Sequence, residues 1–495
     1  MRREPDPYDS LAYPGKCYPD THPDRLAAMA ILHGLSPAPV EHCRVLDIGC
    51  SEGANIIPMA YAMPGSEFVG FDLARLPIER GEERIRELGL ENIRIFQGNL
   101  LDIGKELGSF DYIIAHGFYA WVPELVRDRM LALCGELLTA NGVAFVSYNA
   151  LPGGHLRTMI REMMLFSAEG VDAPEQRVAD GVAFLQFVAG TRDEGDPIRV
   201  MLEERLKRLE TREPGGTFHD ELNDAYYPVQ FSEFAEHAER HGLQYLCEAV
   251  LPGPNDPCYR ADLLPELERV AGDDILRREQ MLDFVRMRAY RQTLLCRTEQ
   301  AVRRDFPAEY LGRLMLASPA WSALGEKPGA KIFTLPSGGR VETNQAAVLA
   351  LLGALESAWP RALRFDELEP RLVEAGFALD GEGVTLLMQL AVAKMIEFHA
   401  WSAPVAAEIA ARPKTSACSR QEARTRAQVA TLLHGTFGFD DPLIRSFLQL
   451  LDGTRDRKSL LEVMRAEFPA VPENELKDGI EMGLGQLYRA GLLEA

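Results

Sequence analysis

The residues whose types and spacing could do chemistry begin with a glycine-bearing turn. The stretch VLDIGCSEG, residues 45–53, places Asp47 two residues before Gly49, and Gly53 follows after four more. Glycines let a backbone turn tightly and approach a ligand closely. A dinucleotide fingerprint reads GxGxxG and holds a pyrophosphate, whereas here a carboxylate precedes the first glycine and Ser51 stands where a glycine is usual. The turn therefore predicts a ligand with a cationic amino group rather than a phosphate.

Three further apolar runs end in residues suited to a nucleoside. Asp72 ends FVGFD, where an acidic side chain can accept both ribose hydroxyls, although Asp is also a common helix N-cap. GNL at 98–100 could meet an adenine edge, and DYIIAHG at 111–117 ends in a small residue. S-adenosylmethionine (SAM) combines a nucleoside with an ammonium group and has no phosphate. The predicted SAM-binding residues are Asp47, Gly49, Cys50, Ser51, Gly53, Asn55, Asp72, Leu73, Gly98, Asn99, Leu100, His116 and Gly117.

Aromatic residues close to the same strand ends could form a slot for a methyl acceptor. Transfer from a sulfonium is an in-line displacement, so the protein has mainly to align the two groups and keep water out. For a lysine acceptor, an apolar aromatic slot also favours the neutral amine. The predicted catalytic residues are His116, Tyr119, Trp121 and Tyr148, and the predicted substrate-binding residues are Tyr13, Tyr18, His22, Asn149 and His155. The alternative for Tyr119 and Trp121 is core packing beneath a loop.

Histidines and cysteines do not indicate a metal centre. His219, His237 and His241 invite a metal hypothesis, but His237 and His241 lack the glutamate of an HExxH motif, which favours an exposed helix face. The eight cysteines form no CxxC pair, and the N-terminus has no apolar segment typical of a signal peptide. We therefore expect no metal and a reduced, cytoplasmic protein.

The elements that position these residues alternate between strand and helix. Apolar runs lie at 43–49, 66–73, 92–100, 110–117 and 142–150, with helical stretches between them. This alternation predicts an α/β fold with a doubly wound, mainly parallel sheet. Residues 155–218 are expected to be a helical insertion, and two late strands near 243–250 and 291–298 to complete the sheet. The alternative is a separate helical domain over 155–300.

The last part of the chain, 304–495, contains two segments in which helices are followed by a short apolar tail, the pattern of a winged helix. Residues 404–426 between them are expected to be a linker. The formal net charge of −21 disfavours binding to phosphate backbones. No run approaches 18 uninterrupted apolar residues, which disfavours membrane insertion. We expect neither nucleic acid nor membrane as a partner.

Four stretches resemble a bacterial family of class I methyltransferases with a methyltransferase regulatory domain. They are THPDRLA (21–27), residues 43–73, FDYIIAHGFYAWVP (110–123) and NGVAFVSYNALPGGHLR (141–157). The family includes protein lysine methyltransferases that act on bacterial surface proteins. The resemblance implies a methyltransferase core at 1–218, a regulatory domain at 219–303, a C-terminal helical domain of winged-helix type at 304–495, and dimerisation.

One departure from the family pattern concerns the acceptor. The family tends to have aromatic residues where this chain has Leu151 and Gly154, which implies a different or narrower substrate. The leading hypothesis is a methyltransferase acting on protein lysines. The alternatives are a methyltransferase for a small metabolite and a SAM-binding regulator whose winged helices contact DNA. The last is disfavoured because the candidate recognition segments lack a basic stripe.

Overall fold

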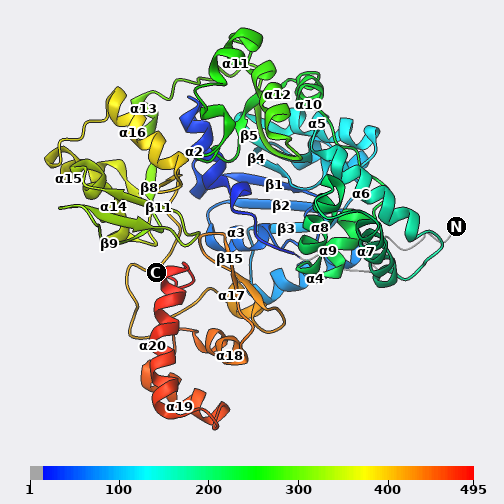
Figure 1. Cartoon of the computed structure of the whole chain (residues 1–495). Helices are drawn as coiled ribbons and strands as arrows, with labels where there is room; N and C mark the ends of the chain where they lie inside the picture. The colour runs from blue at the N-terminus through cyan, green and yellow to red at the C-terminus, as the bar shows by residue number, and fades with distance from the viewer. Residues whose placement is uncertain (1–14) are drawn as a thin grey trace.

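A seven-stranded sheet carries the predicted site (Figure 1). The computed structural model describes residues 15–495 of the chain. The strand order is β3-β2-β1-β4-β5-β7-β6. The first five strands are parallel, and β7 runs antiparallel to both β5 and β6. The strands are β1 Arg44–Ile48, β2 Glu67–Asp72, β3 Ile93–Gln97, β4 Phe110–Ala115, β5 Leu138–Asn149, β6 Leu243–Glu248 and β7 Tyr290–Arg297.

Both faces of this sheet are buried at its centre, which explains why the central strands β1, β4 and β5 are mainly apolar. Successive side chains of a strand point to opposite faces, so Val45 packs into one core and Leu46 into the other. One face is covered by α2, α3 and α4, and the other by α5 and α10. These helices are α2 Pro23–Leu32, α3 Ile56–Ala62, α4 Arg75–Leu88, α5 Glu124–Leu137 and α10 Phe231–Glu239.

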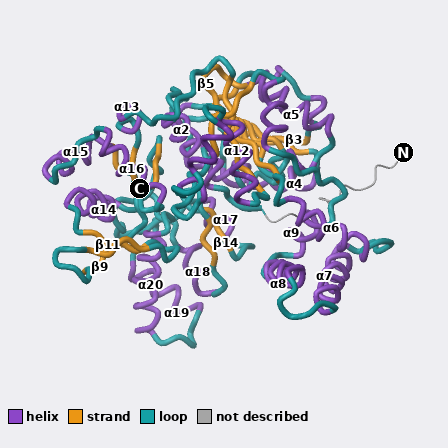
Figure 2. The backbone as a smooth tube through the Cα atoms, turned by 45° about the horizontal axis from the view of Figure 1, so that its top comes forward, coloured by secondary structure: helices purple, strands orange, loops and turns teal. Residues whose placement is uncertain are grey.

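The segment after β5 forms a separate group of four helices with its own small core. In Figures 1 and 2 this group stands on the opposite side of the molecule from α14. The helices are α6 Gly154–Ser167, α7 Pro174–Gly190, α8 Pro197–Glu210 and α9 Pro214–Glu221. The helical insertion is thus confirmed. The alternative of a separate helical domain over 155–300 is wrong, because β6 and β7 belong to the main sheet.

Between β6 and β7 lie α11 (Leu264–Ala271) and α12 (Ile275–Arg286), and after β7 the chain leaves the sheet. The next unit shares the core of the α2 face. Its elements are α13 Ala308–Leu311, β8 Met315–Ala317, β9 Trp321–Leu324, β10 Lys331–Thr334, β11 Arg340–Thr343, α14 Ala346–Ala358, β12 Leu363–Arg364, α15 Phe365–Glu374, α16 Gly381–Val392 and β13 Glu397–His399.

The final unit has a core of its own. Its elements are α17 Ala417–Glu422, β14 Gln428–Ala430, β15 Thr436–Gly438, α18 Pro442–Leu450, α19 Arg457–Glu467 and α20 Glu473–Arg489. The predicted linker over 404–426 is therefore partly wrong: its second half contains α17, where Cys418 and Ser419 are buried. Within residues 15–495, no helix has the length and apolarity that crossing a membrane requires. The boundaries predicted between the three domains stay predictions.

Candidate active site

A cavity of about 910 Å³ opens at the carboxyl ends of the parallel strands. The strand order divides its floor into two halves on either side of β4. We call them the β1–β3 half, which carries Asp47 and Asp72, and the β5–β7 half, which carries Asn149 and Tyr290. The remaining walls come from the N-terminal arm, the insertion and the C-terminal unit. A ligand spanning both halves would pass over the end of β4.

Asp47 is the main charged group of the β1–β3 half. It is the residue before the end of β1, its side chain faces the cavity, and only 4% of the residue is exposed. No residue within 15–495 forms a hydrogen bond with its carboxylate. Burial, with a contribution from the charge of Asp72, raises the pKa of Asp47 to about 7. A buried carboxylate without a partner calls for a cation, so this position fits the ammonium group predicted from the sequence.

The turn after β1 is shaped by left-handed backbone. Gly49 and Gly53 have φ of 76° and 71°, and a Cβ at Gly49 would lie 2.8 Å from Cδ2 of Phe118. Ser51, which stands where a glycine is usual, also has a positive φ of 51°. Its N–H donates to Oδ2 of Asp72 at 2.9 Å. The departure from the glycine pattern is thus accommodated by a hydrogen bond to the next strand end.

Asp72, at the end of β2, connects the glycine turn to the start of α4. Its Oδ1 accepts the N–H of Ala74 at 2.9 Å, and its side chain lies at the cavity wall. Asp72 is thus a cavity residue, and the alternative of a helix N-cap is wrong, because α4 begins at Arg75 with Ala74 as its N-cap and no side-chain capping bond. The other residues predicted from these strand ends also line the cavity, namely Cys50, Leu73, Gly98, Asn99, Leu100, His116 and Gly117. Gly53 does not, and serves the turn instead.

Asn55 lines the cavity, but its amide is occupied by the protein. Its Oδ1 accepts the N–H of Tyr18 at 3.0 Å and faces Nε2 of His434 at 2.9 Å. It thus joins the arm before α2 to the C-terminal unit. That unit reaches the cavity itself through Gln428, and Arg426 pairs with Glu52 of the glycine turn.

Rings and uncharged polar groups dominate the wall above β4 and β7. Tyr18 stacks on His116 at 3.8 Å between ring centroids, and the Tyr290 hydroxyl lies 3.3 Å from Nε2 of His116. Burial lowers the pKa of His116 to about 4. Burial also raises the pKa values of Tyr18 and Tyr290 to about 12. This stretch of wall is therefore uncharged near neutral pH.

Asn149 supplies an unsatisfied acceptor in the β5–β7 half. It ends β5, only 4% of it is exposed, and its Oδ1 is buried without a hydrogen-bond partner in the described chain. Trp121 lies in the same cavity wall, with the Arg157 guanidinium 5.2 Å from its ring centroid. An amine N–H would satisfy the Asn149 oxygen.

Two predicted catalytic tyrosines belong to the core, which corrects the sequence analysis. Tyr148 is 1% exposed and stacks on Phe234 at 4.2 Å. Tyr119 is 2% exposed, and its hydroxyl lies 2.8 Å from Nδ1 of His237. Neither lines the cavity. Both follow or end strands at the right level, but their side chains point to the α10 face of the sheet.

Some of the predicted substrate-binding residues line the cavity, and others lie outside it. Tyr18 and Asn149 line the cavity. His22 is buried away from it, where it caps α2 through Nδ1 and stacks on Trp401 at a 5.6 Å centroid distance. His155 is exposed in the first turn of α6, outside the cavity lining. Tyr13 lies outside the described residues.

Several cavity residues were not predicted. Tyr290 and Gln292 come from β7, and Arg212, His219 and Asp220 come from the insertion. The period-two pattern of β7 would have placed Tyr290 and Gln292 on one face, but nothing in the sequence says that this face meets the cavity. The insertion residues carry no motif at all.

This sheet order, with a nucleoside-type cleft at the carboxyl ends, defines the class I methyltransferase fold. Three families match separate parts of the chain. They are described as a methyltransferase domain over residues 39–165, a predicted methyltransferase regulatory domain over 217–297, and a PKMT C-terminal winged helix domain over 411–476. The chain belongs to the SAM-dependent class I methyltransferases that carry a methyltransferase regulatory domain.

Two relatives and one solved structure are similar to the chain over long stretches. The Rickettsia prowazekii (strain Madrid E) protein RP028 is 33% identical over 240 residues, which are 48% of this chain and 96% of RP028. RP789 of the same strain is 32% identical over 326 residues, and the alignment spans 58% of its length. PKMT2 from Rickettsia typhi, solved in complex with AdoHcy, shares the fold at a TM-score of 0.86 and 24% identity, over 97% of this chain and 99% of PKMT2.

Proposed function

We propose that this protein transfers the methyl group of SAM to the side-chain amine of lysine in a protein substrate. The observation that carries the proposal is the division of one cavity between two unsatisfied groups. Asp47 offers an unpaired carboxylate in the β1–β3 half, and Asn149 offers an unpaired acceptor in the β5–β7 half. The winged-helix match to the PKMT family supports a protein acceptor.

The β1–β3 half fits the cofactor residue by residue. Asp47 would hold the amino group, Asp72 the ribose hydroxyls, and residues 98–100 the adenine edge. When bound, SAM supplies a methyl group on a sulfonium, which is an activated leaving group. The glycine turn gives the ligand room, because a side chain at Gly49 would compete with Phe118 for the same space.

The β5–β7 half fits an amine that must lose its proton. A free lysine has a pKa near ~10.4, and only the neutral amine attacks. The uncharged wall of Tyr18, His116 and Tyr290 disfavours the ammonium form by desolvation. The Asn149 oxygen would then accept an N–H of the neutral amine and orient its lone pair. The faces of the rings also suit a methylammonium product.

Labelled SAM and a bacterial lysate freed of small molecules test the acceptor class. We expect label in protein that survives as methyllysine after acid hydrolysis. Label that enters only an added small-molecule fraction would instead show a metabolite methyltransferase. The variant Asn149→Ala should lose about two- to tenfold in methyl transfer while binding S-adenosylhomocysteine normally, because a hydrogen bond between neutral groups contributes about 0.5–1.5 kcal/mol.

The matched control is His155→Ala, which alters an exposed residue outside the cavity lining and should transfer methyl groups like the parent protein. If Asn149→Ala and His155→Ala behave alike, the Asn149 oxygen does not orient the acceptor. Dimerisation and a cytoplasmic location, both expected from the sequence, stay predictions.

A further inference from the structure

A cluster of one carboxylate and two imidazoles lies outside the cavity, where α5 meets α10. Asp128 comes from α5, His237 from α10, and His241 from the turn that follows α10. The predicted exposed helix face is therefore wrong for this pair, because His237 is buried and His241 lies beyond the end of the helix. Oδ1 of Asp128 lies 3.1 Å from Nε2 of His237 and 2.9 Å from Nε2 of His241. One ligand atom from each of the three residues lies within 4.8 Å of the others. The proposed function gives these residues no role.

The donor set has the chemistry of a borderline divalent cation. Zinc is held by imidazole nitrogen and carboxylate oxygen at about 2.0–2.2 Å. Two such ligands around one tetrahedral ion would be about 3.3 Å apart, so the observed 3.1 and 2.9 Å would have to widen by only a few tenths of an ångström. Nitrogen-containing sets of this kind favour zinc, cobalt or nickel over magnesium and calcium, which prefer oxygen ligands alone.

A buried hydroxyl supports one of the two imidazoles from behind. The Tyr119 hydroxyl lies 2.8 Å from Nδ1 of His237. A metal-bound histidine usually donates its second ring N–H to an oxygen, which fixes the tautomer and the ring orientation. With an ion bound, Nδ1–H of His237 would donate to the Tyr119 hydroxyl, and the Nε2 lone pair would face the ion in place of its present hydrogen bond with Asp128.

Backbone packing holds the three ligands in place. A Cβ added at Gly135 of α5 would lie 2.2 Å from the carbonyl oxygen of His241. The backbone of α5 therefore lies directly against the turn that carries His241. Asp128 is half exposed, with 52% of its side chain accessible, which leaves a path for an ion from solvent. Arg127 and Arg240 lie nearby and weaken the attraction for a cation.

We propose that Asp128, His237 and His241 form a site for a divalent ion of the zinc class that clamps α5 to α10. Such an ion would tie the methyltransferase core to the regulatory domain. It would also stiffen the turn at Tyr119–Trp121, because Tyr119 contacts His237 while Trp121 lines the cavity. Three protein ligands leave at least one position for water, so the site should bind more weakly than a four-ligand structural zinc.

Calorimetry with zinc chloride on chelator-treated full-length protein tests the proposal. We expect one equivalent of zinc per chain, and a cobalt-substituted sample should show the visible absorption of a low-symmetry cobalt site. His241→Asn and Asp128→Asn should each weaken zinc binding at least tenfold, and circular dichroism should show an unchanged fold because Asp128 is half exposed, His241 is partly exposed, and asparagine can still form hydrogen bonds at either position. His42→Asn, which alters an exposed histidine elsewhere, should bind like the parent.

No zinc binding by the parent protein would overturn the proposal, as would a loss smaller than tenfold in either variant. The cluster would then be a hydrogen-bonded contact between α5 and α10. Because the readout is metal binding, the result does not depend on whether the protein methylates lysine.

Discussion

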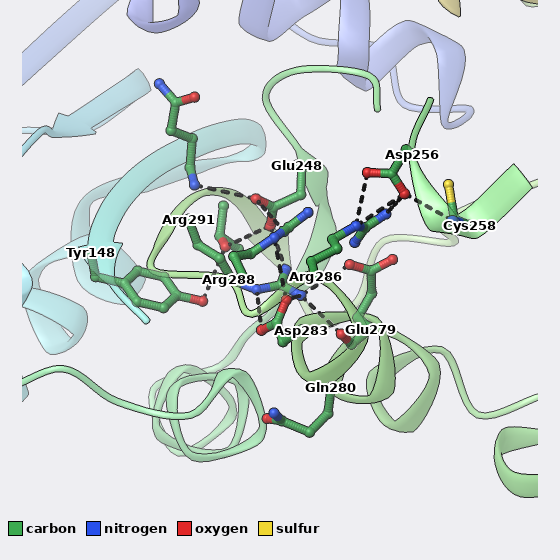
Figure 3. A network of polar contacts seen from close by, with 12 residues as sticks. Tyr148, Glu248, Asp256, Cys258, Glu279, Gln280, Asp283, Arg286, Arg288 and Arg291 are labelled. Atoms are coloured by element: carbon green, nitrogen blue, oxygen red, sulfur yellow. Dashed lines mark hydrogen bonds and ion pairs between the residues drawn. The ribbon is translucent and has the colours of Figure 1, made fainter. Parts of the chain in front are cut away.

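Two buried charged centres of this protein are built in opposite ways. Asp47 faces the cavity and has no hydrogen-bond partner in the described chain. Arg291, which is 1% exposed, is surrounded by partners (Figure 3). It pairs with Glu248 at 2.7 Å, Asp283 at 2.8 Å and Glu279 at 3.0 Å.

Asp47 is therefore available to a ligand, whereas Arg291 stabilises the fold. Arg291 lies on β7 between Tyr290 and Gln292, and successive strand residues face opposite sides. Its guanidinium also covers the Phe231 ring at 3.9 Å. The ion pairs behind β7 thus fix the strand whose other face contributes Tyr290 and Gln292 to the cavity. The paired charge of Arg291 thus positions the cavity wall, whereas the unpaired carboxylate of Asp47 is available to bind a ligand.

Removing the satisfied charge should have the largest effect. Arg291→Met leaves buried carboxylates facing one another, so the free energy of unfolding should fall by about 3–5 kcal/mol. Urea unfolding followed by circular dichroism measures this. In the control Arg260→Met, which breaks an exposed pair with Asp262, the unfolding midpoint should stay unchanged. A similar midpoint in both variants would contradict a structural role for Arg291.

Removing the unsatisfied charge should leave the fold intact and weaken binding. Asp47→Asn keeps the volume but loses a charge-assisted hydrogen bond to the ligand, which contributes about 1.5–3 kcal/mol. Affinity for S-adenosylhomocysteine should fall about 10- to 100-fold in calorimetry, with a melting temperature no lower than that of the parent. Asp102→Asn, at an exposed position, serves as control. Unchanged affinity in Asp47→Asn would remove Asp47 from the cofactor site.

The pH dependence of ligand affinity provides a second test of the role of Asp47. An unfolded Asp has a pKa near ~3.9, and burial raises the pKa of Asp47 to about 7 in the folded protein. The folded state therefore binds the Asp47 proton more tightly than the unfolded state does. The contribution of this proton to the free energy of unfolding is lost as pH rises from about 4 through about 7. Affinity for S-adenosylhomocysteine should rise severalfold between pH ~6 and ~7.5 as the carboxylate ionises. Asp47→Asn should lack this rise; an equal rise in both proteins would assign it to another group.

The smallest expected effect on stability is that of Ser51→Gly, which changes the backbone beside Asp72. Ser51 has a φ of 51°, a conformation that costs a side-chain-bearing residue roughly 1–2 kcal/mol. Ser51→Gly should relieve this strain but loosen the unfolded chain, for a net stabilisation of at most about 1 kcal/mol in thermal unfolding. Its N–H can still donate to Asp72, so cofactor affinity should stay the same. A clear destabilisation would show that the serine side chain supports the turn.

The cofactor half could be read from the sequence because its signals are local. Asp47, Gly49 and Asp72 each follow directly from an apolar run, and parallel strands bring such ends to one edge of the sheet. The prediction for the acceptor side was limited by the direction of individual side chains. Tyr148 precedes Asn149 on β5, and successive residues of a strand face opposite sides. Tyr119 lies in a short 3-10 turn after β4, and its ring packs into the core.

What the sequence determined by itself was the order of strands and helices and the class of ligand at their ends, because strand periodicity and glycine turns depend on neighbours in the chain. What only the tertiary structure decided was the contribution of β7 to the acceptor wall and the ion pairs behind that strand. Tyr290, Asn149 and His116 meet there because β7 inserts antiparallel beside β5. Contacts between residues so far apart in the sequence arise from packing of the whole sheet, and no local pattern specifies them.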